Sequence, residues 1–268
     1  CVCVCVCVCV MGGVHLTHRV PLGLSVLLGA CAWALQGPGL GVLRVLLTYL
    51  ATLALLIGVG MWGSWGFLTG KDPRTGQLPT WSRLVWLPWY ALIRLQMILF
   101  RKMLYPDVPV VTPVTDTLFL GGYPTAGSSV ATPNQLTALI TISPRNLEQV
   151  PWKHQLDCTT EMPRTLHTDV LGDYLCIPMW DGTIPSTQQI NQAVQWLLER
   201  RNDPTLVHCA YGASRSATFV LAFLCASGQC ANPVEAASFV LARRRCLKLS
   251  PRHAMRLQQW WQQWQQKQ

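Results

Sequence analysis

An uncharged run from Val45 to Leu68 limits the possible folds of this chain more than any other feature. Its length suits the hydrocarbon thickness of a bilayer, and Trp62 and Trp65 near one end are typical of a membrane–water interface. A buried core helix of a soluble protein rarely continues this far without a polar face. The run therefore predicts a membrane-spanning helix over 45–68 and an integral membrane protein.

A shorter apolar stretch at 20–36 has two interpretations. Arg19 precedes it, and Ala30-Cys31-Ala32 resembles the small-residue cleavage site of a signal peptide. The stretch is equally compatible with a first membrane span that forms a hairpin with 45–68. The sequence leaves both alternatives open.

The segment 84–100 is aromatic and basic, and Pro88 and Arg94 disfavour a further span. It predicts a helix that lies in the membrane interface, and a helix packed on a domain is the alternative. Positive residues concentrate after the long run, so the positive-inside tendency places the C-terminal part in the cytosol or an organelle interior. These residues are Lys71, Arg74, Arg83, Arg94, Arg101 and Lys102.

The ten residues before Met11 repeat Cys-Val and are excluded from fold reasoning as low-complexity sequence; Met11 is the plausible true start. The other cysteines are scattered without metal-ligand spacing, which indicates a reducing compartment and predicts no metal site. The formal net charge is +9, but no cluster resembles a nucleic-acid module, so no nucleic-acid partner is expected. Arg243-Arg244-Arg245 is interpreted as a solvated helix end.

Residues 105–268 are predicted to form one mixed α/β domain, because strand-like and helical patterns alternate there. Short β-rich runs lie at 117–120, 138–142, 174–178 and 205–208, and 186–201 has helical periodicity. Asn232-Pro233 and Ser250-Pro251 each have the pattern of a helix N-cap followed by proline at the first helical position. The fold class is therefore α/β, preceded by residues 11–104 as a hydrophobic, helical, membrane-associated region.

The segment from His208 to Ser216 carries the chemistry. A cysteine, Cys209, is followed six positions later by Arg215, with Gly212 midway, between an apolar strand and an apolar helix. Backbone N–H groups of such a loop can point inward and bind an anion at the helix N-terminus. Arg215 matches two phosphate oxygens with its planar fork. The predicted substrate-binding residues are Ala210, Tyr211, Gly212, Ala213, Ser214 and Arg215.

The same positive surroundings should favour the thiolate of Cys209, which can attack phosphorus and form a phosphocysteine. Ser216 is placed to bond the sulfur and help it leave. Asp181, on a turn after a strand, is the predicted general acid and base. The chemistry requires no metal or cofactor. Asp169, Asp173 and Asp203 compete with Asp181 for this role, and His208 is interpreted as structural.

On these residues, the sequence resembles the dual-specificity branch of the protein tyrosine phosphatase superfamily, over roughly residues 112–262. The resemblance includes Thr115–Gly121, which is similar to the opening strand of the family. It implies a mostly parallel central sheet flanked by helices. It also implies that Cys209 is the nucleophile, that Arg215 binds phosphate, that Asp181 is the acid and base, and that Ser216 assists thiolate departure.

The resemblance leaves the substrate open. The uncharged Ala210, Tyr211 and Ala213 favour phosphoproteins carrying phosphotyrosine, phosphoserine or phosphothreonine as substrates. Membrane attachment favours the alternative, a phospholipid such as phosphatidylglycerophosphate or a phosphoinositide. A third alternative is an inactive phosphate-binding scaffold, against which the joint presence of Cys209, Arg215 and Asp181 argues.

Overall fold

The computed structural model describes residues 18–35, 37, 39–124, 152–164 and 172–267, so the strand expected at 138–142 lies outside the described residues. The chain divides into two compact units. The first ends at Leu68 and also includes Trp180–Thr183, and the second consists of Thr69–Met179 and Ile184–Gln268. The first of these units ends at residue 68 because the segment 69–104 groups with the sheet of the second unit; the expected domain boundary at 104 stays a prediction.

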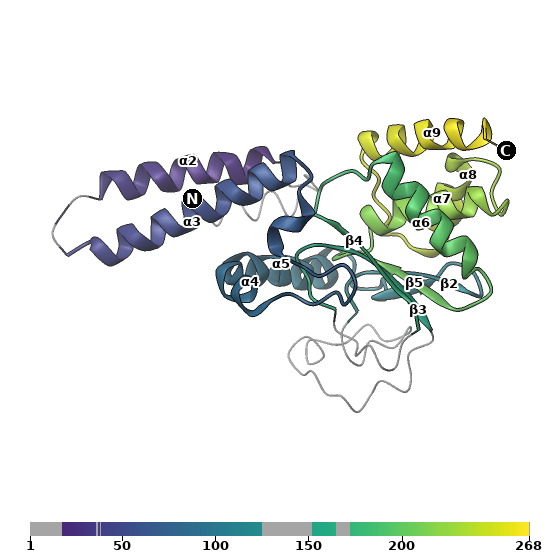
Figure 1. Cartoon of the computed structure of the whole chain (residues 1–268), viewed down its shortest axis with the longest axis horizontal. Helices are drawn as coiled ribbons and strands as arrows, with labels where there is room; N and C mark the ends of the chain where they lie inside the picture. The colour runs from purple at the N-terminus through teal and green to yellow at the C-terminus, as the bar shows by residue number, and fades with distance from the viewer. Residues whose placement is uncertain (1–17, 36, 38, 125–151, 165–171, 268) are drawn as a thin grey trace, which may run out of the picture. The chain divides into compact units, whose positions relative to one another are not determined.

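The first unit is built on two helices that lie side by side, α2 (Arg19–Ala34) and α3 (Gly41–Trp62) (Figure 1). They approach closely at Gly58, where an added Cβ would be 2.6 Å from Cγ of Leu22. Within the described residues, α3 is the one helix long and apolar enough to cross a membrane, with a mean hydropathy of 2.2. It ends at Trp62 rather than at the expected Leu68, because Ser64 takes a positive φ of 55°.

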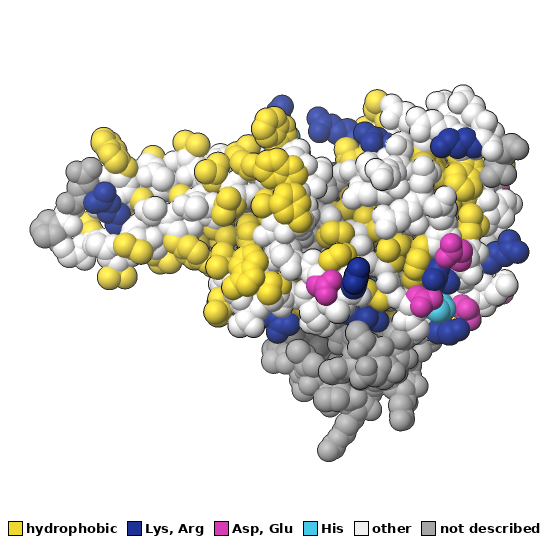
Figure 2. Space-filling model, in the orientation of Figure 1, with side chains coloured by type: hydrophobic (Ala, Val, Ile, Leu, Met, Phe, Trp, Pro, Cys, Tyr) yellow, Lys and Arg dark blue, Asp and Glu magenta, His cyan; other side chains and the backbone are white. Residues whose placement is uncertain are grey.

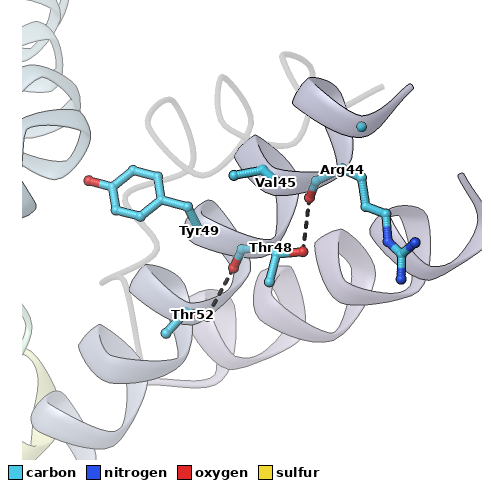
Figure 3. A pocket seen from close by; sticks show the side chains of 6 residues that line it. Arg44, Val45, Thr48, Tyr49 and Thr52 are labelled. Carbon is cyan, nitrogen blue, oxygen red and sulfur yellow. Dashed lines mark hydrogen bonds between the residues drawn. The ribbon is translucent and has the colours of Figure 1, made fainter. Parts of the chain in front are cut away.

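One side of α3 carries polar side chains, which surround a shallow pocket (Figure 3). The Thr48 hydroxyl donates to the Arg44 carbonyl over 2.9 Å, and the Thr52 hydroxyl donates to the Thr48 carbonyl over the same distance. Both hydroxyls therefore find acceptors within the helix itself, which suits a helix surrounded by hydrocarbon.

The second unit contains a five-stranded sheet in the order β1-β2-β5-β3-β4. The strands are β1 (Val111–Pro113), β2 (Leu118–Gly121), β3 (His154–Thr159), β4 (Tyr174–Met179) and β5 (Thr205–His208). Only the β1–β2 pair is antiparallel among the described pairs. The expected α/β class and mostly parallel sheet are thus confirmed, whereas the sequence patterns did not reveal β1 and β3.

Helices α6 (Thr187–Glu199), α7 (Arg215–Ala226), α8 (Pro233–Arg243) and α9 (Pro251–Gln265) lie on one side of the sheet (Figure 1). Side chains alternate across β2 and β5, so Leu120 and Val207 join the main core with these helices. Phe119 and Leu206 face the other side, where Val111 and Trp152 complete a smaller cluster. The expected N-caps at Asn232 and Ser250 are both present, and Ser186 caps α6 in the same way.

The segment before the sheet forms α4 (Thr80–Val85), α5 (Leu87–Leu99) and a π-helical turn, η2 (Phe100–Leu104). The buried side of α5 carries Trp89, Tyr90, Ile93, Gln96 and Met97, at helical spacing. The other side is exposed and still largely apolar. The segment 84–100 therefore has one side packed within the second unit and one side open.

Candidate active site

The cysteine loop, residues 209–214, connects the end of β5 to the first residue of α7. Its outer side is formed by the carbonyl groups of residues 210–214, each of which accepts a hydrogen bond from outside the loop. Ala210 O accepts from Tyr123 N, Ala213 O from Lys248 N and Ser214 O from Thr218 N, at 2.9–3.0 Å. Since each peptide group is planar and trans, the N–H groups that follow these carbonyls point to the inner side of the loop.

Arg244 completes this outer layer. Its Nε donates to Gly212 O over 2.8 Å, and its Nη2 donates to Tyr211 O over 3.2 Å. The side chain is only 2% exposed, so interpreting the whole basic triplet 243–245 as a solvated helix end was wrong for its central member. The sequence, in which Arg244 is one of three consecutive arginines, gives no indication that it binds the loop carbonyls.

Gly212 is required for two reasons. Its φ is +71°, in the left-handed region that favours glycine. An added Cβ would also be 2.4 Å from the backbone of Gly121 and 2.5 Å from the Arg244 guanidinium. The loop can therefore close against β2 only with glycine at this position.

Inside the loop, the Sγ of Cys209 accepts two hydrogen bonds. The backbone N–H of Gly212 donates over 3.2 Å, and the Ser216 hydroxyl donates over 3.3 Å. The thiol is 2% exposed and lies at the N-terminus of α7. Inward amides, a helix N-terminus and a hydroxyl all stabilise negative charge on the sulfur.

Arg215 is buried and held by a carboxylate that the sequence analysis did not identify. Its Nη2 donates to Glu161 Oε1 over 2.8 Å and its Nη1 to Glu161 Oε2 over 3.2 Å. Nη1 also donates to the Met179 carbonyl over 2.7 Å. Glu161, just after β3, therefore fixes the plane of the guanidinium.

Asp181 lies on the turn that follows β4, in the part of the chain that groups with the first unit. Its neighbour Trp180 is buried there, and the indole donates to Trp65 O over 3.0 Å. The competing residues Asp173 and Asp203 come just before β4 and β5, whereas Cys209 comes just after β5. Asp173 and Asp203 therefore lie at the other end of the strands from Cys209, where each pairs with a cation. Asp169 lies outside the described residues. The role of Asp181 stays a prediction.

A buried ionic network lies beneath the loop. Lys71 Nζ contacts Asp157 Oδ2 at 2.6 Å and also donates to the Thr159 carbonyl at 2.7 Å. Burial alone would raise the pKa of Asp157, but Lys71 and His208 hold it well below its usual range. Burial lowers the pKa of His208 to about 4, so its imidazole is neutral at pH 7, which agrees with a structural role.

A thiol inside a ring of inward amides, at a helix N-terminus and six residues before a buried arginine, defines a cysteine-dependent phosphatase domain. The family description "Dual specificity phosphatase, catalytic domain" matches residues 134–263. Together with this geometry, the match supports a dual-specificity phosphatase domain of the protein tyrosine phosphatase superfamily in the C-terminal part of the chain.

Curated relatives agree with this assignment. The dual specificity protein phosphatase OPG106 of vaccinia virus (strain Copenhagen) is 25% identical over 128 residues, which cover 47% of this chain and 64% of that protein. The dual specificity protein phosphatase H1 of variola virus is 24% identical with the same coverage. The chain thus spans less than two thirds of the length of these relatives.

Solved structures with a similar fold include PTPMT1 in complex with PI(5)P and human DUSP28. The first has a TM-score of 0.48 and 18% identity, over 59% of this chain and 98% of that chain. The second has a TM-score of 0.47 and 19% identity, over 59% of this chain and 96% of that chain.

Proposed function

We propose that this protein hydrolyses phosphomonoesters through a covalent phosphocysteine on Cys209. The observation that carries the proposal is the cysteine loop itself, whose carbonyls are bonded on the outer side while its N–H groups and the Cys209 sulfur share the inner side. Such a ring binds the three non-bridging oxygens of a phosphate and stabilises the charge that develops on them.

The reaction proceeds in two displacements. The thiolate of Cys209 attacks phosphorus, the bond from phosphorus to the ester oxygen breaks, and Asp181 gives its proton to the departing oxygen. Asp181 then takes a proton from water, whose oxygen attacks phosphorus. The phosphorus–sulfur bond breaks, inorganic phosphate is released and the Cys209 thiolate is regenerated. Arg215 binds phosphate oxygens in both steps.

Trapping the intermediate tests this mechanism. The full chain in detergent is mixed with an aryl phosphate and chelator, quenched in acid, and digested for mass spectrometry. A phosphate adduct on the peptide that contains Cys209 is expected, and the Cys209→Ser protein should give neither adduct nor turnover. Turnover that survives this substitution would refute the thiol mechanism.

Ser216→Ala should slow the second displacement more than the first. The hydroxyl lies 3.3 Å from the sulfur and stabilises the departing thiolate, and a hydrogen bond to a charged group contributes about 1.5–3 kcal/mol. We expect kcat to fall roughly ten- to hundredfold, with a stoichiometric burst of alcohol and accumulation of phosphocysteine. Stopped-flow measurement of the burst checks this, and loss of the burst together with kcat would contradict it.

We infer that the substrate is a phosphoprotein. The loop side chains Ala210 and Ala213 are small and buried, and neither adds charge for a polyanionic headgroup. Phospholipid monoesters are the second candidate, favoured by the apolar helix α3 and by the exposed side of α4 and α5. Phosphopeptides compared with phosphatidylglycerophosphate and phosphoinositides at equal concentration decide between them, and binding without turnover would indicate a scaffold.

We also propose that the protein is held at a membrane by α3, with the segment 84–100 in the interface and the catalytic domain in the cytosol or an organelle interior. The proposed membrane attachment is supported by the many apolar side chains on the protein surface (Figure 2). Between Thr80 and Leu104 there is no acidic residue. The exposed side chains of this segment include Trp81, Leu84, Leu87, Arg94, Leu95, Lys102 and Met103. Protease protection in sealed vesicles tests the orientation.

A further inference from the structure

The end of α5 and the turn η2 contact the cysteine loop from outside the region that matches the family. The Tyr211 hydroxyl donates to Gln96 Oε1 over 3.1 Å, and the Tyr211 ring meets Phe100 edge-on at 5.1 Å between centroids. The family match begins only at residue 134. Part of the support for the loop therefore comes from the segment that follows the apolar helix α3.

Arg101, in η2, places a cation beside the same loop. Its Nη2 donates to the Tyr123 carbonyl over 3.0 Å, and Tyr123 N in turn donates to Ala210 O. A Cβ added at Gly122 would lie 2.9 Å from Arg101 Nη2 and 3.1 Å from the carbonyl oxygens of Ala210 and Tyr211. The Arg101 guanidinium and the carbonyls on the outer side of the loop therefore both lie next to Gly122.

Arg244 is the second cation at the loop, and it also bonds Thr112 and the Pro109 carbonyl. Within the described part of the chain, neither Arg101 nor Arg244 forms a salt bridge with a carboxylate. Burial, and then the charge of Arg244, lowers the pKa of Arg101 to about 10, so both groups remain charged at pH 7. The interactions that raise the pKa of each arginine again are with Cys246 first and also with Cys209.

A buried cation such as Arg244, next to the partly buried Arg101 and with no carboxylate partner among the described residues, is costly unless an anion lies nearby. The groups around the loop show where that anion is. Among the described residues, burial raises the pKa values of Cys158 and Cys246 and lowers that of His208, so the candidates for that anion are the Cys209 sulfur, which accepts from Gly212 N and Ser216, and a phosphate bound in the loop. Arg215, also at the loop, is paired with Glu161.

Resting on the proposed phosphatase function, we propose that Arg101 and Arg244 are positioning residues that form a cationic outer layer of the cysteine loop. Arg244 holds the Tyr211 and Gly212 carbonyls outward, which keeps the amides directed at the phosphate. Arg101 adds positive charge that favours the thiolate and the bound phosphate dianion. The segment 96–101 is thereby part of the active site.

Substitutions in the full chain separate charge from geometry. Arg101→Gln should lower kcat/KM about tenfold and move the acid limb of the pH–rate profile to higher pH, because removing a nearby cation disfavours the thiolate. It should also weaken inhibition by inorganic phosphate and vanadate. Arg101→Lys keeps the charge and should restore the position of the acid limb.

Arg244 should behave differently. Arg244→Lys keeps the charge but cannot bond both carbonyls, so the acid limb should stay in place while kcat falls. Arg94→Gln and Lys102→Gln are matched controls, because both side chains are exposed cations of the same segment. They should leave the pH profile and phosphate inhibition unchanged.

Circular dichroism and thermal melting establish that each variant is folded. If Arg101→Gln does not fold, Arg101→His is used instead. The histidine loses its charge as the pH rises through about 6.5, so the charged and neutral forms are compared in one protein. If an Arg101 variant lacking the charge is fully active and keeps the wild-type pH–rate profile and phosphate affinity, the inference about Arg101 is wrong, while the proposed phosphatase function still stands. Absence of Cys209-dependent hydrolysis in the wild-type protein would instead overturn the proposed function.

Discussion

Glu161→Gln should lower kcat/KM about a hundredfold or more, although Glu161 is not among the residues that the cysteine motif identifies. Both oxygens of Glu161 accept from the Arg215 guanidinium, and both side chains are almost completely buried. Glutamine offers one acceptor and turns an amide N–H group toward the other guanidinium nitrogen. The arginine plane is then misplaced for phosphate, at a cost of about 3 kcal/mol in the transition state.

Steady-state kinetics with an aryl phosphate measure this effect. Glu199→Gln is the matched control, because it removes a carboxylate from an exposed pair with Arg200 and should leave activity unchanged. Glu161→Asp keeps the charge but has a shorter side chain, so its kcat/KM should lie between those of Glu161→Gln and Glu199→Gln. A folded Glu161→Gln protein with nearly wild-type kcat/KM would show that the buried pair does not position Arg215.

Lys71→Met should destabilise the second unit by about 3–5 kcal/mol, because it leaves the Asp157 carboxylate buried without its counter-charge. Lys71 lies between α3 and the sheet in the sequence, and its Nζ contacts Asp157, the Thr159 carbonyl and the Thr159 hydroxyl. Hydrogen exchange of the β3 and β5 amides in the full chain measures the change.

The pH dependence of this effect has a defined sign. In the wild-type protein the pKa of Asp157 is held low, so its stabilising contribution is present above the unfolded value of about 3.9 and is lost as the pH falls. His208, with its pKa lowered to about 4, reduces stability further between about pH 6.5 and 4, because the unfolded chain binds the proton first. In Lys71→Met, Asp157 becomes protonated at higher pH, so the stability difference from wild type should narrow on acidification.

Two further variants isolate the buried pair. Lys71→Met combined with Asp157→Asn should recover part of the lost stability, since a neutral amide needs no counter-charge. Lys153→Met removes an exposed partner of Asp203 and should leave stability almost unchanged. Equal effects of Lys71→Met and Lys153→Met would mean that the buried ion pair contributes nothing measurable.

The sequence predicted the elements whose patterns are local. Strands at 174–178 and 205–208 and the helix at 186–201 agree with the structure to within two residues, because alternation and helical spacing are set by neighbouring positions. Strand β3 was missed because its residues His154, Gln155 and Asp157 are polar. They are buried only because distant groups such as Lys71 and His208 neutralise and bond them.

The motif by itself determined that Cys209, Gly212, Arg215 and Ser216 lie on one strand–turn–helix segment, where the Gly212 N–H and the Ser216 hydroxyl contact the Cys209 sulfur. Only the tertiary structure decided what holds this loop in shape. Glu161 is 54 residues from Arg215, and Lys71 is 86 residues from Asp157. Such pairs leave no periodicity in the sequence, because their partners meet only when the sheet assembles and burial makes an unpaired charge too costly to keep.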